Sequence, residues 1–135
     1  MVEMFRAATK TLAPEADAIA PDGCEVRILV QTARGSMAHF TLGPGQVARA
    51  VAHRTVEELW YVLSGKGRMW RRLAEWEETV EVAAGVSLSI PLGTHFQLRN
   101  DGEEPLAAVA VTMPPWPGED EACFVEGRWP ATVRA

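Results

Sequence analysis

The sequence has few of the features that disulfide-rich or membrane-spanning proteins need. Its two cysteines, Cys24 and Cys123, lie far apart with no close-spaced thiol or histidine pair around them. They predict free thiols in a reducing cytoplasm. No apolar run approaches the ~18 residues of a membrane span, and no charged-then-apolar leader opens the chain. We therefore expect a soluble, unprocessed, cytoplasmic protein.

Positive charge is also scarce. The chain has 13 Lys and Arg against 18 Asp and Glu, a net charge of −5. A nucleic-acid partner would call for a basic face, so this balance argues against one. We expect a small-molecule ligand, and neither a nucleic acid nor a membrane as partner.

No long helical period appears, whereas nine prolines and eleven glycines punctuate a chain that is 47% hydrophobic. At 135 residues the chain predicts one domain. Roughly nine or ten strands, one about every ten residues, are typical of an antiparallel sandwich or barrel. The predicted strands cover residues 25–30, 37–42, 47–53, 59–63, 68–73, 77–82, 86–90, 95–99 and 106–112.

The first of two glycine-bounded stretches runs from Gly45 to Gly65. Five residues separate Gly45 from Val51, one separates Val51 from His53, four separate His53 from Glu58, and six separate Glu58 from Gly65. A histidine and a carboxylate delivered by neighbouring strands onto one barrel wall are a common way to build a small-molecule or metal site.

The second stretch begins at Gly85. Five residues separate Gly85 from Pro91, and one residue separates Pro91 from Gly93. Two residues then lead to Phe96, and three more lead to Asn100. The prolines and glycines predict a tight bend before the strand that carries Phe96.

Together, the two stretches resemble the two motifs of the cupin superfamily in order and spacing. The chain looks like a small single-domain cupin of the microbial cupin-2 type, with motifs at about 45–65 and 85–100. The resemblance implies an all-β, antiparallel double-stranded β-helix, or jelly-roll barrel, over residues 1–135. Val51 and Phe96 stand where the family has histidines, and His95 sits one position early.

The ends of the chain supply two further expectations. Residues 113–135, with four prolines between Pro114 and Pro130 and with Trp116 and Trp129, predict an ordered coil packed across the barrel. Open sandwiches leave sheet edges that need covering. Together with the resemblance, the leader and this tail predict a homodimer.

Strand side chains alternate between the two faces of a sheet, so residues two apart share a face. If His53 and Glu58 point inward, then Val51 and Trp60 do so as well. These residues then form an aromatic and apolar pocket with two polar groups, the predicted catalytic pair His53 and Glu58. The alternative for His53 and Glu58 is a place at the solvated end of a strand.

The second motif leaves two alternatives open. A regular strand places Phe96 and Leu98 in the pocket. A bulge near Gly93 would instead turn His95 and Gln97 inward, because a one-residue slip reverses the face.

Three functions fit these residues. The first is a metal-dependent enzyme in which His53, Glu58 and His95 hold a divalent zinc, nickel, manganese or iron ion, with Gln97 as a poor fourth ligand. The second is a metal-free isomerase or cyclase for a small carbonyl compound, with His53 and Glu58 as acid and base. The third is a non-catalytic barrel that binds a small organic ligand.

Overall fold

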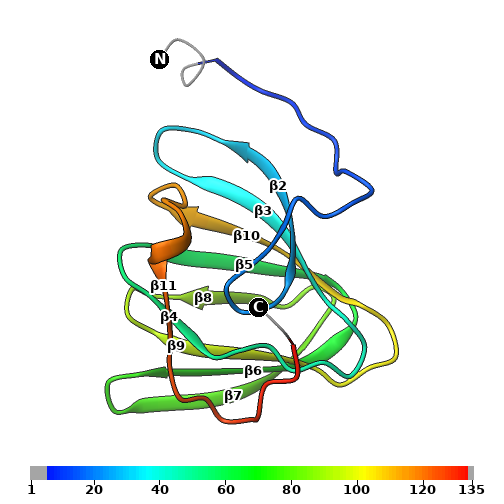
Figure 1. Cartoon of the computed structure of the whole chain (residues 1–135), viewed down its shortest axis with the longest axis vertical. Helices are drawn as coiled ribbons and strands as arrows, with labels where there is room; N and C mark the ends of the chain where they lie inside the picture. Colours follow the sequence, from blue (N-terminus) through cyan, green and yellow to red (C-terminus); the bar gives the residue numbers. More distant parts are fainter. Residues whose placement is uncertain (1–5, 134–135) are drawn as a thin grey trace.

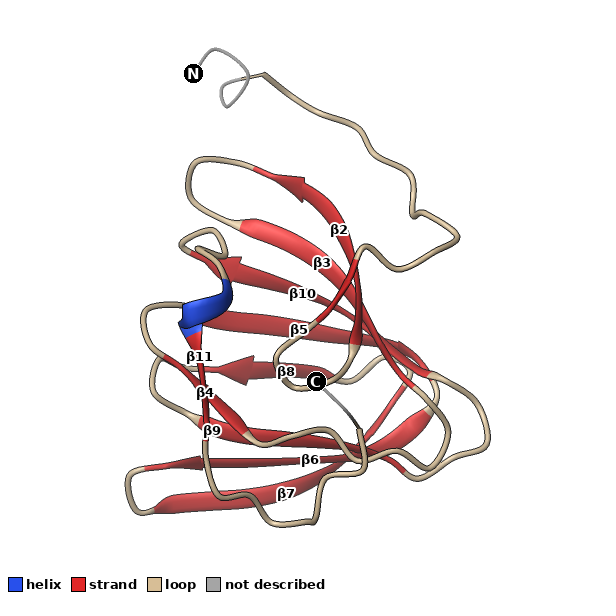
Figure 2. Cartoon of the chain, viewed as in Figure 1, coloured by secondary structure: helices blue, strands red, loops and turns tan. Residues whose placement is uncertain are grey.

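Two antiparallel β-sheets face each other and enclose the core of the protein, as Figure 1 and Figure 2 show for a computed structural model that describes residues 6–133. One sheet has the strand order β1-β2-β3-β10-β5-β8 and the other β11-β4-β9-β6-β7. The strands are β1 (Ala18–Ile19), β2 (Glu25–Gln31), β3 (Ser36–Leu42), β4 (Val51–His53), β5 (Glu57–Ser64), β6 (Lys66–Leu73), β7 (Trp76–Ala83), β8 (Ser87–Ile90), β9 (His95–Asn100), β10 (Leu106–Met113) and β11 (Ala122–Phe124), with a short 3-10 helix, η2 (Glu119–Glu121). The predicted all-β, antiparallel jelly-roll barrel is confirmed.

Strand β5 shows why the chain folds this way. Its buried residues Glu58, Trp60 and Val62 alternate with exposed ones, as a strand requires. Trp60 lies opposite Ala110 of β10, whose small side chain leaves room for the indole. Phe40 of β3 stacks on Trp60 with ring centroids 5.6 Å apart. These two aromatic side chains are therefore packed between the sheets.

The end of each motif has a structural role. Gly65 has a φ of +85°, and a Cβ there would lie 2.7 Å from the backbone of Leu106. Only glycine fits such a turn without strain. Asn100 is buried, and its side-chain amide donates to the carbonyls of Leu42 and Glu104 while its oxygen accepts from the Gly102 N–H. These two motif positions therefore fix turns rather than the pocket.

The structure differs from the predicted strand 47–53 and from the predicted coil in the tail. Strand β4 begins only at Val51, because the pairing with β9 shifts by one residue between the isolated bridge of Val47 with Arg99 and the pair of Val51 with Phe96. The tail contributes β11, which pairs along β4. It thereby covers an edge that would otherwise be open.

Two further sequence-based expectations concern the cysteines and membrane-spanning helices. Cys24 is buried, Cys123 is half-buried, and both are free, as predicted. No helix in the described part of the chain is both long and apolar enough to cross a membrane.

Candidate functional site

The two motif residues His53 and Glu58 meet inside the barrel. The Nε2 atom of His53 lies 3.4 Å from Oε2 of Glu58, and both side chains are less than one-tenth exposed. The other carboxylate oxygen, Oε1, accepts a hydrogen bond of 2.8 Å from Nε1 of Trp60. The indole therefore orients the carboxylate that faces the imidazole.

Apolar side chains fill the two positions where histidines were expected from the family motifs. Val51 of β4 and Phe96 of β9 are direct cross-strand partners, and both are buried. The Phe96 ring lies edge-on to His53 at 5.3 Å and to Trp60 at 6.3 Å. Leu98 belongs to the same core. Strand β9 thus has the regular register, with Phe96 and Leu98 facing inward.

The register of β9 corrects two predicted site residues. Gln97 is buried on the opposite face, where its amide donates to Ala48 and Trp129 and its oxygen accepts from the Arg128 and Trp129 N–H groups. His95 alternates with Phe96 and so shares the face of Gln97. The structure therefore places His95 and Gln97 on the face of β9 that points away from His53 and Glu58, rather than in the barrel pocket.

The donors that remain do not fit a metal ion. Among residues 6–133, no three His, Cys, Asp or Glu side chains are grouped so that they could hold one. His53 and Glu58 supply two donors, whereas protein metal sites with an open position for chemistry typically use three. Val51 and Phe96 supply no donor atom.

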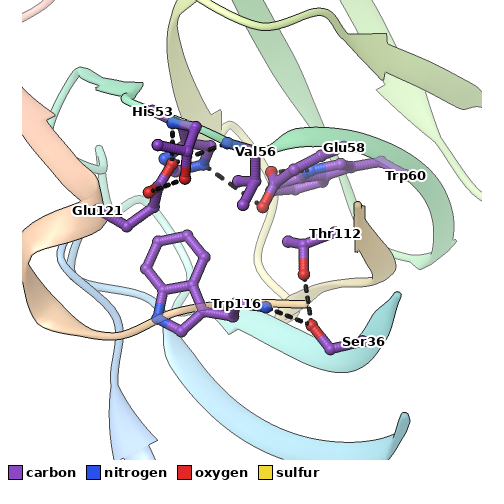
Figure 3. A network of polar contacts seen from close by, with 9 residues as sticks. Ser36, His53, Val56, Glu58, Trp60, Thr112, Trp116 and Glu121 are labelled. Carbon is purple, nitrogen blue, oxygen red and sulfur yellow. Dashed lines mark hydrogen bonds and ion pairs between the residues drawn. The ribbon is translucent and has the colours of Figure 1, made fainter. Parts of the chain in front are cut away.

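The C-terminal tail adds an aromatic residue that sequence reasoning did not assign to the site. Figure 3 shows the indole of Trp116 beside the polar groups at this end of the barrel, and its ring centroid lies 5.1 Å from that of His53. Its backbone N–H donates to Oγ of Ser36, which is hydrogen-bonded to Thr112. Thr112 is the cross-strand partner of Glu58. Trp116 is therefore anchored to the same row of side chains as Glu58.

The tail also fixes the loop between β4 and β5. The buried carboxylate of Glu121 accepts hydrogen bonds from the N–H groups of Thr55 and Val56, at 2.6 and 2.9 Å, and from the Thr55 hydroxyl. Burial alone would raise the pKa of Glu121, but these hydrogen bonds and nearby His53 lower it below its ordinary value. This loop joins His53 to Glu58, so Glu121 stabilises the geometry of the pair. The position of Glu121 in a proline-rich tail gave no signal for this role.

A second missed residue is Thr94. The register pairs Val51 with Phe96 and Ala52 with His95, so the next pair in line is His53 and Thr94. Oγ1 of Thr94 and Nδ1 of His53 are both buried, and neither has a hydrogen-bond partner among the described residues. Buried polar groups are normally paired. An unpaired nitrogen at the end of β4 and an unpaired hydroxyl just before β9 therefore indicate a place for a polar atom of a ligand or for water.

A further carboxyl group contributes to the electrostatics of the interior. Asp22 is buried, and it accepts a hydrogen bond from the N–H of Cys24. Burial raises the pKa of Asp22, the hydrogen bonds from Cys24 oppose this rise, and the charge of Glu58 adds to it. The barrel interior is therefore acidic and disfavours an additional negative charge.

Comparison with known proteins agrees with this fold. Residues 38–112 match the sequence model of the cupin domain. An uncharacterised protein of Methanocaldococcus jannaschii, MJ1618, is 30% identical over 120 residues, which cover 82% of this chain and 93% of that protein. The xanthan biosynthesis protein XanB of Xanthomonas campestris pv. campestris is 29% identical over 99 residues, which cover 73% of this chain and 20% of XanB.

The fold is similar to that of oxalate decarboxylase from Bacillus subtilis, with a TM-score of 0.69 at 22% identity. The similarity covers 81% of this chain and 29% of the decarboxylase chain. Another structure of that enzyme is described by its Mn(II) centres. At this identity the likeness concerns the fold, and the chain spans less than a third of the enzyme.

The unpaired hydroxyl of Thr94 leads to a prediction about stability. Replacing a buried, unsatisfied hydroxyl by a methyl group of the same shape removes a desolvation penalty of about 1–3 kcal/mol. Thr94→Val should therefore raise the free energy of unfolding of the ligand-free protein by about 1 kcal/mol, measured by urea denaturation. Thr94→Ser, which keeps the hydroxyl, should give no such gain. A loss of stability in Thr94→Val would show that the hydroxyl is paired.

The lowered pKa of Glu121 predicts a pH dependence. Because its folded-state pKa lies below the ordinary value of 4.5, the carboxylate stabilises the fold above that pH, and the contribution is lost as the pH falls through the folded-state pKa. Glu121→Gln should lower the free energy of unfolding at pH 7 by about 1–3 kcal/mol. The difference from wild type should shrink in acid. Glu126→Gln, an exposed change in the same tail, is the control and should show neither effect.

The filled histidine positions predict weak metal binding. Val51 and Phe96 are direct partners, so Val51→His with Phe96→His places two imidazoles side by side near His53 and Glu58. Calorimetry with zinc should show an affinity at least an order of magnitude above wild type, about 1.4 kcal/mol. A wild type that already binds one zinc ion per chain as tightly as the double variant would contradict this.

Proposed function

The chain belongs to the cupin domain family, and from that premise we propose that it binds a small, uncharged organic ligand at the Trp116 end of its barrel, where His53 and Glu58 move a proton. The observation that carries the proposal is the buried His53–Glu58 contact, together with the unpaired Nδ1 atom on the other side of the imidazole. A proton on Nε2 faces the Glu58 carboxylate and leaves the lone pair of Nδ1 free to accept a proton. This is the arrangement of a general base with its orienting carboxylate.

The walls of the site support an organic ligand. The rings of Phe96 and Trp116 lie against His53, and Trp60 packs against Phe96, while the polar groups are few. Small-molecule sites typically combine such apolar walls with a small number of placed polar atoms. A ligand hydroxyl could donate a hydrogen bond to Nδ1 of His53 and accept one from Oγ1 of Thr94, whereas a ligand carbonyl oxygen could accept only from Thr94.

The charges of the interior favour a neutral ligand. Glu58 is buried in the site, and the buried carboxylate of Glu121 is close enough to His53 to interact with its charge. Without a metal ion, a dianion such as oxalate would meet these carboxylates with no compensating cation among the site residues. We therefore do not extend the activity of oxalate decarboxylase to this chain. Isomerisation or cyclisation of a neutral carbonyl compound suits the pair better.

The test begins with a thermal-shift screen of neutral carbonyl and hydroxyl compounds against wild type, since a ligand that binds the folded state raises its melting temperature. For a compound that binds, His53→Gln and Glu58→Gln should each weaken binding or turnover at least tenfold. Calorimetry and product analysis on the same compound separate binding from conversion.

The chain supplies matched controls. Glu57 is the exposed neighbour of Glu58, and His95 lies on the outer face of β9. Glu57→Gln and His95→Gln should leave binding and turnover unchanged. Equal losses in the controls would reject the proposed pair. Binding that depends on His53 and Glu58 with no conversion of any bound compound would establish the non-catalytic barrel instead.

A further inference from the structure

The C-terminal tail encloses a groove on the outer face of the sheet that contains β4 and β9. After β11 the tail crosses this sheet, as Figure 1 shows, and the N–H of Val125 donates to the carbonyl of Ala50. The side-chain oxygen of Gln97 accepts from the N–H groups of Arg128 and Trp129. Between the tail and the sheet lies a cavity of about 290 Å³, which we call the tail groove. Docking of the tail therefore creates this space.

The walls of the tail groove are mostly apolar. Its lining includes Ala50, Phe124, Val125, Trp129 and Ala131. Small-molecule sites combine such walls with a few placed polar groups, and their volumes typically run from about 300 to 1,000 Å³. The tail groove is at the lower end of this range. It therefore suits a single small ring or a short chain rather than a nucleotide.

Arg49 contributes a positive charge to this lining. Its guanidinium carbon lies 4.8 Å from the centroid of the Phe124 ring. A stacked guanidinium keeps its N–H groups at the edge of its plane, where they can donate as a fork to an anion. Among the side chains that the structure describes, none forms an ion pair or a hydrogen bond with this guanidinium. Arg49 is half-buried, so its charge is partly desolvated without a counter-ion.

The other charges near the tail groove offset one another. Arg99 stacks on Trp129, with its guanidinium carbon 4.7 Å from the ring centroid, but its Nε atom lies 2.6 Å from a carboxylate oxygen of Asp101. Arg128 and Glu126 are both exposed and carry opposite charges. No acidic residue of the described chain lines the tail groove. One uncompensated positive charge therefore remains, that of Arg49.

We propose that the tail groove binds a small organic monocarboxylate, with its carboxylate on Arg49 and its apolar body between the tail and the sheet. The fork of one guanidinium matches the two oxygens of one carboxylate. A phosphate dianion would bring a second negative charge with no further uncompensated cation in the lining to meet it. Binding here is independent of His53 and Glu58, because those residues lie inside the barrel.

Calorimetry with benzoate on the full-length protein at pH 7 tests the tail groove. Wild type should bind one benzoate per chain, and neutral benzamide, which has the same shape, should bind about tenfold more weakly or less. Arg49→Gln removes the fork and should raise the dissociation constant of benzoate about tenfold or more. The control, Arg72→Gln, removes the same charge from an exposed position on β6 of the same sheet and should leave that constant unchanged.

Circular dichroism verifies that each variant keeps its β-sheet spectrum. If Arg49→Gln does not fold, Arg49→Met keeps a side chain that packs on the Phe124 ring without a charge, and it should show the same loss. Absence of saturable benzoate binding up to roughly 10 mM would overturn the proposal. So would equal binding of benzamide, or binding that the Arg49 variants leave unchanged. An equal loss in Arg72→Gln would also overturn it, because net charge rather than the tail groove would then attract the anion.

Discussion

The alternation of side chains along β5 governs both faces of this protein. One strand places Glu58 and Trp60 inside the barrel and Leu59 and Tyr61 outside, and a slip of one residue would exchange the two sets. The stacking of Trp60 on Phe40 and its hydrogen bond to Glu58 stabilise this register. The same packing that excludes water from the core therefore also orients the carboxylate in the candidate site.

The tail completes the site from a distant part of the chain. Trp116 packs against His53, Glu121 accepts hydrogen bonds from the loop before Glu58, and β11 extends the sheet beside β4. His53 therefore lies between the barrel wall and a segment more than 60 residues further along the chain. Backbone pairing and the buried carboxylate of Glu121 hold this segment in place. Substitutions in the tail are therefore expected to shift the positions of His53 and Glu58 as well as to remove direct contacts with them.

Most of the barrel could be predicted from the sequence, because alternating apolar residues and glycine turns act locally. The inward positions of His53, Glu58 and Trp60 follow from the same pattern. The face of His95 could not be decided, since a bulge at Gly93 depends on tertiary packing that a local pattern does not contain. Trp116 and Glu121 were missed for a related reason. A proline-rich tail has no period that shows which barrel strand it will meet.

Replacing imidazoles with Val51 and Phe96 changes the chemistry available inside the barrel. A bound cation would compensate the charge of Glu58, whereas here Nε2 of His53 faces one carboxylate oxygen and the indole N–H of Trp60 donates to the other. Phe96 also presses its ring edge against His53, where a further donor would otherwise stand. Coordination of an ion at Glu58 would need further donor atoms, and the side chains of Val51 and Phe96 supply none. Val51 and Phe96 at the two motif positions thus leave one histidine and one carboxylate in contact, beside aromatic and apolar side chains.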